Sequence, residues 1–139
     1  MSEIAQLIIG SEKLTSIFGR WPSFHDAEVH ELRFQRGHID TEAKVYEFPL
    51  LTIELHLWLM TNDVDQKGYY VSTKHTLTTM KFHDVDNFKM EGFNHQNAIF
   101  GLGIEQKNTR RRTFAILRGR FRAILRNRRY VYLLAYRNR

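Results

Sequence analysis

The chain has 139 residues, a formal net charge of +6 and no cysteine, so it is long enough for one domain with a hydrophobic core, while disulfides and cysteine nucleophiles or ligands are excluded. Its longest apolar run near the end, Tyr130–Tyr136, is far too short to cross a bilayer, and the first residues do not match a secretory signal. These features predict one soluble domain over residues 1–139, located in the cytoplasm.

Residues 1–19 are predicted to form a helical segment. Apolar side chains recur at roughly helical spacing between Ile4 and Phe18, and Gly10-Ser11 interrupts them, which predicts one broken helix or two short ones. Gly19 is suited to end the helix with a positive φ, and Pro22 cannot continue it. We expect an apolar face of this segment to pack on a sheet.

Strand patterns follow from residue 27 onward. Apolar and polar residues alternate from Leu51 to Leu59, which predicts a central strand. The other predicted strands lie at 27–36 (where the spacing allows a bulge), 69–82, 88–90, 100–104, 114–118, 121–126 and 130–136, with turns at 62–68, 92–97 and 107–109. The order predicts an α+β, mostly β fold: an antiparallel sheet of about six to eight strands with the N-terminal helical segment packed on it.

Charge is distributed unevenly along the chain. Residues 107–139 hold twelve Lys and Arg and no acidic residue, whereas residues 1–106 hold the other nine basic residues (21 − 12) and all fifteen acidic ones. This split is typical either of a polyanion-binding tail or of basic strands lying beside acidic strands in one sheet. We favour the second interpretation, because the basic stretch is rich in strand-forming residues. The alternation of Arg118, Arg120 and Arg122 is interpreted as one solvated face of a hairpin.

Residues 20–28 connect the helical segment to the first strand and contain the sequence WPSFHDAE. His25 beside Asp26 could act as an oriented general base, or form a metal site together with Glu28. We favour a structural role, in which Ser23 and Asp26 bond nearby backbone amides while Trp21 and Phe24 fasten the helical segment to the sheet. Adjacent residues of a strand point to opposite faces, so His25 and Asp26 are not required to share a site.

Catalytic and metal-binding patterns are otherwise weak. The histidines at 25, 30, 38, 56, 75, 83 and 95 include no HxH or HExxH spacing. His25-Asp26 resembles the two-residue signature of metal-dependent phosphohydrolases, but those enzymes carry further ligands on helices. No nucleophile elbow, phosphate-binding loop or dinucleotide fingerprint is present. The sequence therefore predicts no enzyme, no catalytic residue, no metal and no cofactor. Phe24-His25-Asp26 recurs as Phe82-His83-Asp84, which we interpret as coincidence.

The segment from Phe18 to Val29 resembles the immunity protein 50 family, predicted bacterial proteins encoded beside polymorphic toxins. The likeness continues through Leu57–Thr61, Leu77–Phe82 and the EGFNHQN sequence of Glu91–Asn97, so it covers about residues 18–104. The resemblance implies a toxin-neutralising protein that binds a cognate toxin, without catalysis or cofactor. The residues that match the family's motifs, in a structural or a binding role, are Trp21, His25, Asp26, Glu28, Asn94 and Asn97.

Several side chains are candidates for contact with a partner. Tyr69 and Tyr70 are predicted aromatic anchors on the toxin-facing surface, whereas Trp58 is interpreted as covering the helical segment. Arg110, Arg111 and Arg112 lie in the basic end, where arginine and aromatic residues interleave as in phosphate-contacting and base-stacking surfaces. The alternative function is therefore a nucleic-acid-binding module that uses these arginine-rich strands. No membrane partner is expected, and a monomer and a homodimer are both compatible with the sequence.

Overall fold

The computed structural model describes residues 3–107, 112–125 and 131–137. Helices in these residues are short, and strands make up most of the structure, so the α+β, mostly β class is confirmed. The elements are α1 (Glu3–Gln6), α2 (Glu12–Phe18), β1 (Glu28–Gln35), β2 (Ile39–Asp40), β3 (Val45–Tyr46), β4 (Leu50–Val64), β5 (Tyr70–Phe82), β6 (Val85–Met90), β7 (Leu102–Lys107), β8 (Arg112–Leu117), β9 (Phe121–Leu125) and β10 (Val131–Arg137).

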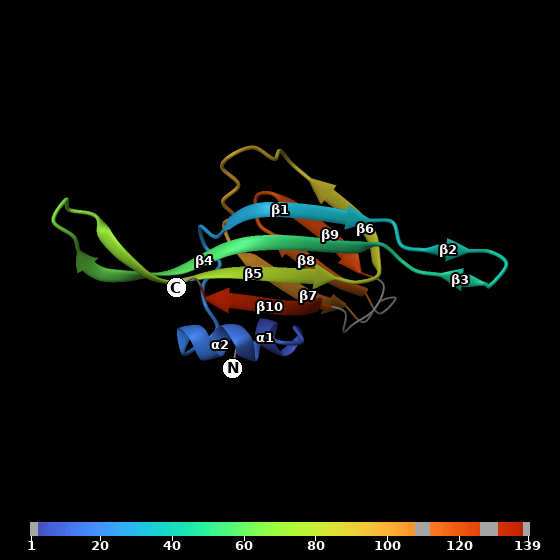
Figure 1. Ribbon diagram of the computed structural model, residues 1–139, viewed down its shortest axis with the longest axis horizontal. Helices are drawn as coiled ribbons and strands as arrows, with labels where there is room; N and C mark the ends of the chain where they lie inside the picture. The colour runs from blue at the N-terminus through green and yellow to red at the C-terminus, as the bar shows by residue number, and fades with distance from the viewer. Residues whose placement is uncertain (1–2, 108–111, 126–130, 138–139) are drawn as a thin grey trace.

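The strands form two facing antiparallel sheets rather than one (Figure 1). The front sheet has the strand order β1-β4-β5-β10, the back sheet has the order β6-β9-β8-β7, and β2 pairs only with β3. Apolar side chains from the inner faces of both sheets join one buried cluster, which includes Leu55 and Met80 from the front and Leu117 and Leu125 from the back. The hydrophobic core therefore lies between the sheets, as in a β-sandwich.

Strand β4 is central in the front sheet, as its alternation predicts. Leu51, Ile53, Leu55 and Leu57 are buried, while the residues between them face outward and are half-buried. The strand continues to Val64, so the predicted turn at 62–68 begins later than expected. This extension pairs with the start of β5 and carries both strands beyond the body of the sandwich (Figure 1).

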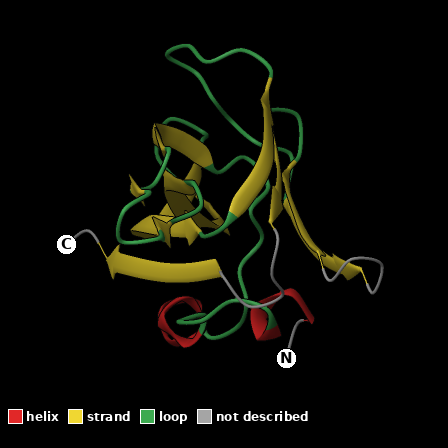
Figure 2. Cartoon of the chain, turned by 90° about the vertical axis from the view of Figure 1, so that its right-hand side faces the viewer, coloured by secondary structure: helices red, strands yellow, loops and turns green. Residues whose placement is uncertain are grey.

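The helical segment is interrupted and ended where the sequence predicts. Gly10 has a φ of 90°, and a Cβ at this position would lie 2.5 Å from the carbonyl oxygen of Leu133, so only glycine fits there without strain. Gly19 has a φ of 78° and its N–H donates to the carbonyl of Thr15. Both helices lie below β10 in Figures 1 and 2, at the edge of the sandwich rather than on a sheet face. Leu14 and Phe18 extend the core there.

The short hairpin of β2 and β3 was not predicted from the sequence, because each strand has only two residues. The strands of the basic end pair with strands from earlier in the chain: β9 pairs with β6, which holds Asp86, β8 pairs with β7, which holds Glu105, and β10 pairs with β5. The described part of the basic stretch therefore lies in the sheets beside strands that carry acidic residues, as the favoured interpretation expects. Within the described ranges, no helix has the length and apolar character needed to cross a membrane.

Candidate functional site

The ends of β4 and β5 form a protruding hairpin, here called the long arm (residues 59–72). The pairing register shifts between Leu57 and Leu59, and Lys74 on β5 has a φ of 55°. Such a bulge increases the local twist and bends the strands, and the long arm leaves the body of the sandwich at this point (Figure 1). The Thr61 hydroxyl donates to the carbonyl oxygen of Val71 at 2.6 Å, which fastens the two strands of the arm together.

The tip of the long arm is held by one carboxylate. Asp65 Oδ1 accepts hydrogen bonds from the N–H groups of Lys67 at 2.9 Å and Tyr69 at 3.0 Å. Gly68 takes a φ of 84°, as a residue without a side chain does readily. Tyr69 and Tyr70 are 68% and 63% exposed beside this turn. The structure thus presents two aromatic side chains on an ordered turn, which lowers the entropy that a binding partner has to overcome.

A hollow of about 350 Å³ lies at the base of the long arm, between the arm and residues 18–26. Trp58, Leu59 and Met60 line it from β4. The opposite wall is formed by Phe18, Arg20, Pro22, Ser23, His25 and Asp26. Part of the WPSFHDAE segment therefore faces solvent next to the arm. Trp58 shares this hollow with Phe18 of α2, and its ring centroid lies 5.0 Å from that of His56 on the front sheet.

His25 and Asp26 contact each other in a turn, so the strand geometry by which adjacent side chains point to opposite faces does not apply to them. Asp26 has a φ of 67°, a left-handed conformation that ends the strand-like alternation assumed for this segment. His25 Nδ1 lies 3.1 Å from Asp26 Oδ2, and both side chains are 63% exposed. The predicted bond of Ser23 is present, because its hydroxyl oxygen accepts the N–H of His25 at 3.2 Å.

Replacing His25 by alanine is expected to change the free energy of unfolding by less than about 0.5 kcal/mol, because a polar contact between two exposed side chains contributes little to stability. Urea denaturation of the wild type and the His25→Ala variant at pH 7.5 measures this difference. A loss of several kcal/mol would contradict the assignment of His25 to the exposed surface and would indicate a structural role.

Three of the remaining motif residues meet in one hydrogen-bond network beside the same turn, and the side chain of Asn97 is its buried centre. The backbone N–H of Asn97 donates to Glu28 Oε1. The Asn97 side chain, which is 3% exposed, accepts the N–H of Asn94 at 2.8 Å and donates to the carbonyls of Val29 at 3.3 Å and Asn94 at 2.5 Å. Trp21 packs against the buried Phe24, with 5.4 Å between ring centroids and the ring planes tilted by 37°. Glu28 is therefore brought together in a structural network with Asn94 and Asn97, which lie far from it in sequence.

A cluster of imidazoles on the outer face of the front sheet was missed by sequence reasoning. His56 Nε2 and His75 Nδ1 are 2.9 Å apart, and the ring centroid of His30 lies 5.7 Å from that of His56. Burial, followed by the charges of His75 and His30, lowers the pKa of His56 below its ordinary value of 6.5, against an opposing effect of Glu28. The alternation in β4 places His56 and Trp58 on one face, but only the strand register brings His75 beside them.

Lowering the pH is expected to destabilise the protein through His56. The unfolded chain binds a proton at pH values below about 6.5, whereas the folded chain binds it only at lower pH, so stability is lost as the pH falls below 6.5. The loss of the free energy of unfolding should be below about 1 kcal/mol, because solvent screens this partly exposed site. Urea denaturation at pH 7.5 and 5.5 measures this loss, which should be smaller for the His56→Gln variant than for the wild type. Equal differences would contradict the prediction.

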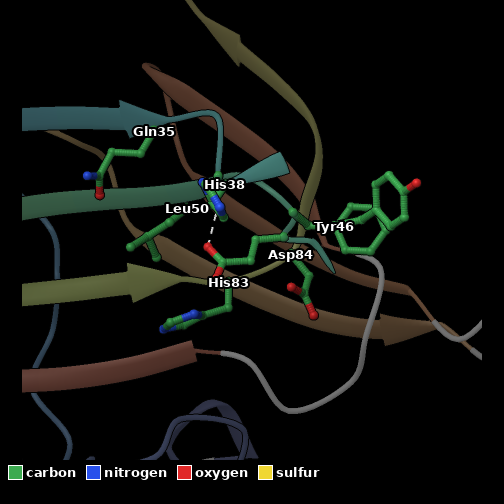
Figure 3. A pocket seen from close by; sticks show the side chains of 9 residues that line it. Gln35, His38, Tyr46, Leu50, His83 and Asp84 are labelled. Carbon is green, nitrogen blue, oxygen red and sulfur yellow. Dashed lines mark hydrogen bonds between the residues drawn. The ribbon is translucent and has the colours of Figure 1, made fainter. Parts of the chain in front are cut away.

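A second hollow lies at the other end of the front sheet, beneath the short arm (residues 37–48, which contain β2 and β3). It has a volume of about 760 Å³, and Figure 3 shows Gln35, His38, Tyr46, Leu50, His83 and Asp84 around it. The backbone N–H of His38 donates to the Glu47 carboxylate at 3.3 Å. His83 and Asp84 thus line this hollow, as His25 and Asp26 line the hollow under the long arm.

The two Phe-His-Asp segments share two features. Phe24 and Phe82 are both buried, and Asp26 and Asp84 have positive φ values of 67° and 57°. The hydrogen bonds differ, because the N–H of Ala27 closes a turn onto the carbonyl of Phe24, whereas Phe82 ends β5 and the N–H of Val85 donates to Pro49. The recurrence therefore does not correspond to one repeated turn.

Only part of the arginine-rich end lies within the residues that the structure describes. Arg110 and Arg111 lie outside the described residues, and of Arg112 only the backbone, which begins β8, is described. Arg118 and Arg120 lie in the turn before β9 and Arg122 lies on β9 itself. Arg120 and Arg122 line the same hollow, so these two share a face of the hairpin as predicted. Arg120 donates to the carbonyls of Ala98 and Gln96 at 3.3 and 3.0 Å. This guanidinium holds the loop 96–98, which leaves fewer free donors for phosphate groups.

Among the residues that the structure describes, no three His, Asp or Glu side chains gather as a metal site would require.

Comparison with known proteins gives one match. The sequence model of a family described as Immunity protein 50 matches residues 10–126. The match therefore includes the helical segment α2, both arms and most of the two sheets. No curated protein and no solved structure matches the chain.

Proposed function

The chain belongs to the immunity protein 50 family, and from this premise we propose that it neutralises a cognate bacterial polymorphic toxin by binding it. The family match over residues 10–126 is the observation that carries the proposal. The protein acts in the cytoplasm of the cell that produces the toxin. It works by occupying a surface of the toxin, without a cofactor and without chemistry of its own.

The long arm is the proposed toxin-binding surface. Stable protein complexes bury about 800 Å² on each partner, with a few aromatic or arginine side chains at the centre. Tyr69 and Tyr70 offer two such aromatic side chains, and Met60 and Val64 on the same arm are each 57% exposed. The hollow beneath the arm, with His25 and Asp26 on its wall, extends this surface toward the body of the protein.

Co-expression with a toxin-domain protein encoded beside this chain tests the proposal. We expect the cells to survive the toxin and the two proteins to co-purify as a complex that resists high salt. Absence of both protection and a complex would refute the proposal. Recovery of nucleic acid alone, released as salt rises, would instead support the nucleic-acid-binding alternative, because phosphate contacts weaken with salt.

A further inference from the structure

The sandwich has two open sides, and the chain covers them differently. On the side of β10 and β7, the N-terminal segment lies along the edge: the N–H of Ile9 donates to Val131 and the N–H of Leu133 donates to Ile9, both at 2.9 Å. Helices α1 and α2 complete this cover. On the side of β1 and β6, the described residues provide no helix. An apolar strip between the two sheets therefore meets solvent there.

This strip, here called the seam, consists of Leu32 and Phe34 on β1, Met90 on β6 and Phe93 in the following loop. Phe34, Met90 and Phe93 are 47%, 46% and 44% exposed, although all three are large apolar side chains. Phe34 stacks on Phe88 at 5.6 Å, so the seam is continuous with the core. A hollow of about 310 Å³ opens beside Leu32, Met90 and Phe93. Contiguous exposed apolar surface of this kind is typical of an interaction site.

The chain itself shows how this edge is covered. Residues 97–99 lie antiparallel to the start of β1: the N–H of Val29 donates to Asn97 and the N–H of Ile99 donates to Ala27, both at 3.0 Å. This added segment ends at the β-bulge between Val29 and Glu31. From Glu31 to Gln35, β1 is an edge strand that pairs with β4 on its other side. An edge strand offers a row of backbone donors and acceptors to another extended chain.

We infer that an extended segment of the toxin adds to β1 at residues 31–35, continues the pairing that residues 97–99 begin, and inserts an apolar side chain into the seam. This inference rests on the proposed function. Alternate residues of an added strand face the seam, so the segment must alternate apolar and polar residues. Arg33 and Glu31 already pair with each other at 2.8 Å, so this part of the edge favours a segment without net charge.

Two measurements on the complex test the inference. Amide hydrogen exchange should slow in residues 31–35 when the toxin-domain protein used in the co-expression experiment, in a catalytically inactive form, is added. The Met90→Glu variant should raise the Kd by about 30-fold or more, because a carboxylate would be buried against the apolar segment. Asn87→Glu is the matched control: it adds the same group to β6, at an exposed position paired with Ile124 rather than Phe121, and should bind as the wild type does.

The outcomes separate this inference from the proposed function. If the complex forms but the amides of residues 31–35 stay unprotected, no strand is added and the inference is wrong, while the proposed function stands. Met90→Glu binding like Asn87→Glu would also overturn it. Protection that depends on the concentration of this protein alone would assign the edge to a second copy instead. If the wild type forms no complex at all, the proposed function fails and the inference fails with it.

Discussion

Replacing Tyr69 and Tyr70 together by alanine is expected to raise the Kd of the toxin complex by at least about 100-fold, a loss of about 3 kcal/mol. Both rings are more than 60% exposed in the free protein, so their truncation removes surface that only a partner can bury. The turn that carries them is held by Asp65 through bonds to backbone amides. The substitutions therefore leave the shape of the arm in place, and the free energy of unfolding should fall by less than about 1 kcal/mol.

Tyr46→Ala provides the matched control for this experiment. Tyr46 is 61% exposed on the short arm, at the opposite end of the front sheet. Calorimetric titration of the wild type, the double variant and this control against the inactive toxin measures the three Kd values. If the double variant binds as tightly as the wild type, the long arm is not the contact surface. If Tyr46→Ala weakens binding equally, the toxin contacts both arms.

Replacing Asn97 by alanine is expected to lower the free energy of unfolding by about 2–4 kcal/mol. The side chain is 3% exposed and makes three hydrogen bonds to backbone groups of Val29 and Asn94. Its loss leaves buried donors and acceptors without partners, which costs more than the bonds themselves contribute. It also loosens the loop whose residues 97–99 cover the start of β1.

Two further variants check the mechanism of this loss. Asn97→Asp keeps the accepting oxygen but replaces the donor that faces two carbonyls, so it should destabilise the protein about as much as alanine does. Asn94→Ala should cost about 1 kcal/mol or less, because Asn94 is exposed and its side chain accepts one hydrogen bond, from the N–H of Gln96. Urea denaturation at pH 7.5 measures all three. An Asn97→Ala variant with normal stability but no toxin binding would instead assign this residue to the interface.

The motif residues therefore divide into two groups that the sequence could not separate. In the first group Asn97 is buried, Glu28 and Asn94 bond to it, and Trp21 packs against the buried Phe24. In the second group, His25 and Asp26 are largely exposed beside the long arm. A resemblance to a family identifies both groups, because residues needed for folding and residues needed for binding can stand in the same sequence motif. Burial and hydrogen bonding distinguish them.

The local structure and the family could be predicted from the amino-acid sequence alone. The alternation from Leu51 to Leu59 predicts a central strand, and Gly10 and Gly19 predict where the helical segment breaks and ends, because these signals depend on side-chain periodicity and backbone sterics within a few residues. The WPSFHDAE and EGFNHQN segments were likewise sufficient to predict the family to which the chain belongs.

The pairing of the strands could not be predicted from the sequence and became known from the three-dimensional structure. The division into two sheets, the approach of His75 to His56 and the contact of Glu28 with Asn97 all join residues far apart in the chain. Each strand can satisfy its backbone groups with several others, and the choice depends on which combination buries the apolar faces of all the strands at once. That is a property of the whole core, and no local pattern encodes it.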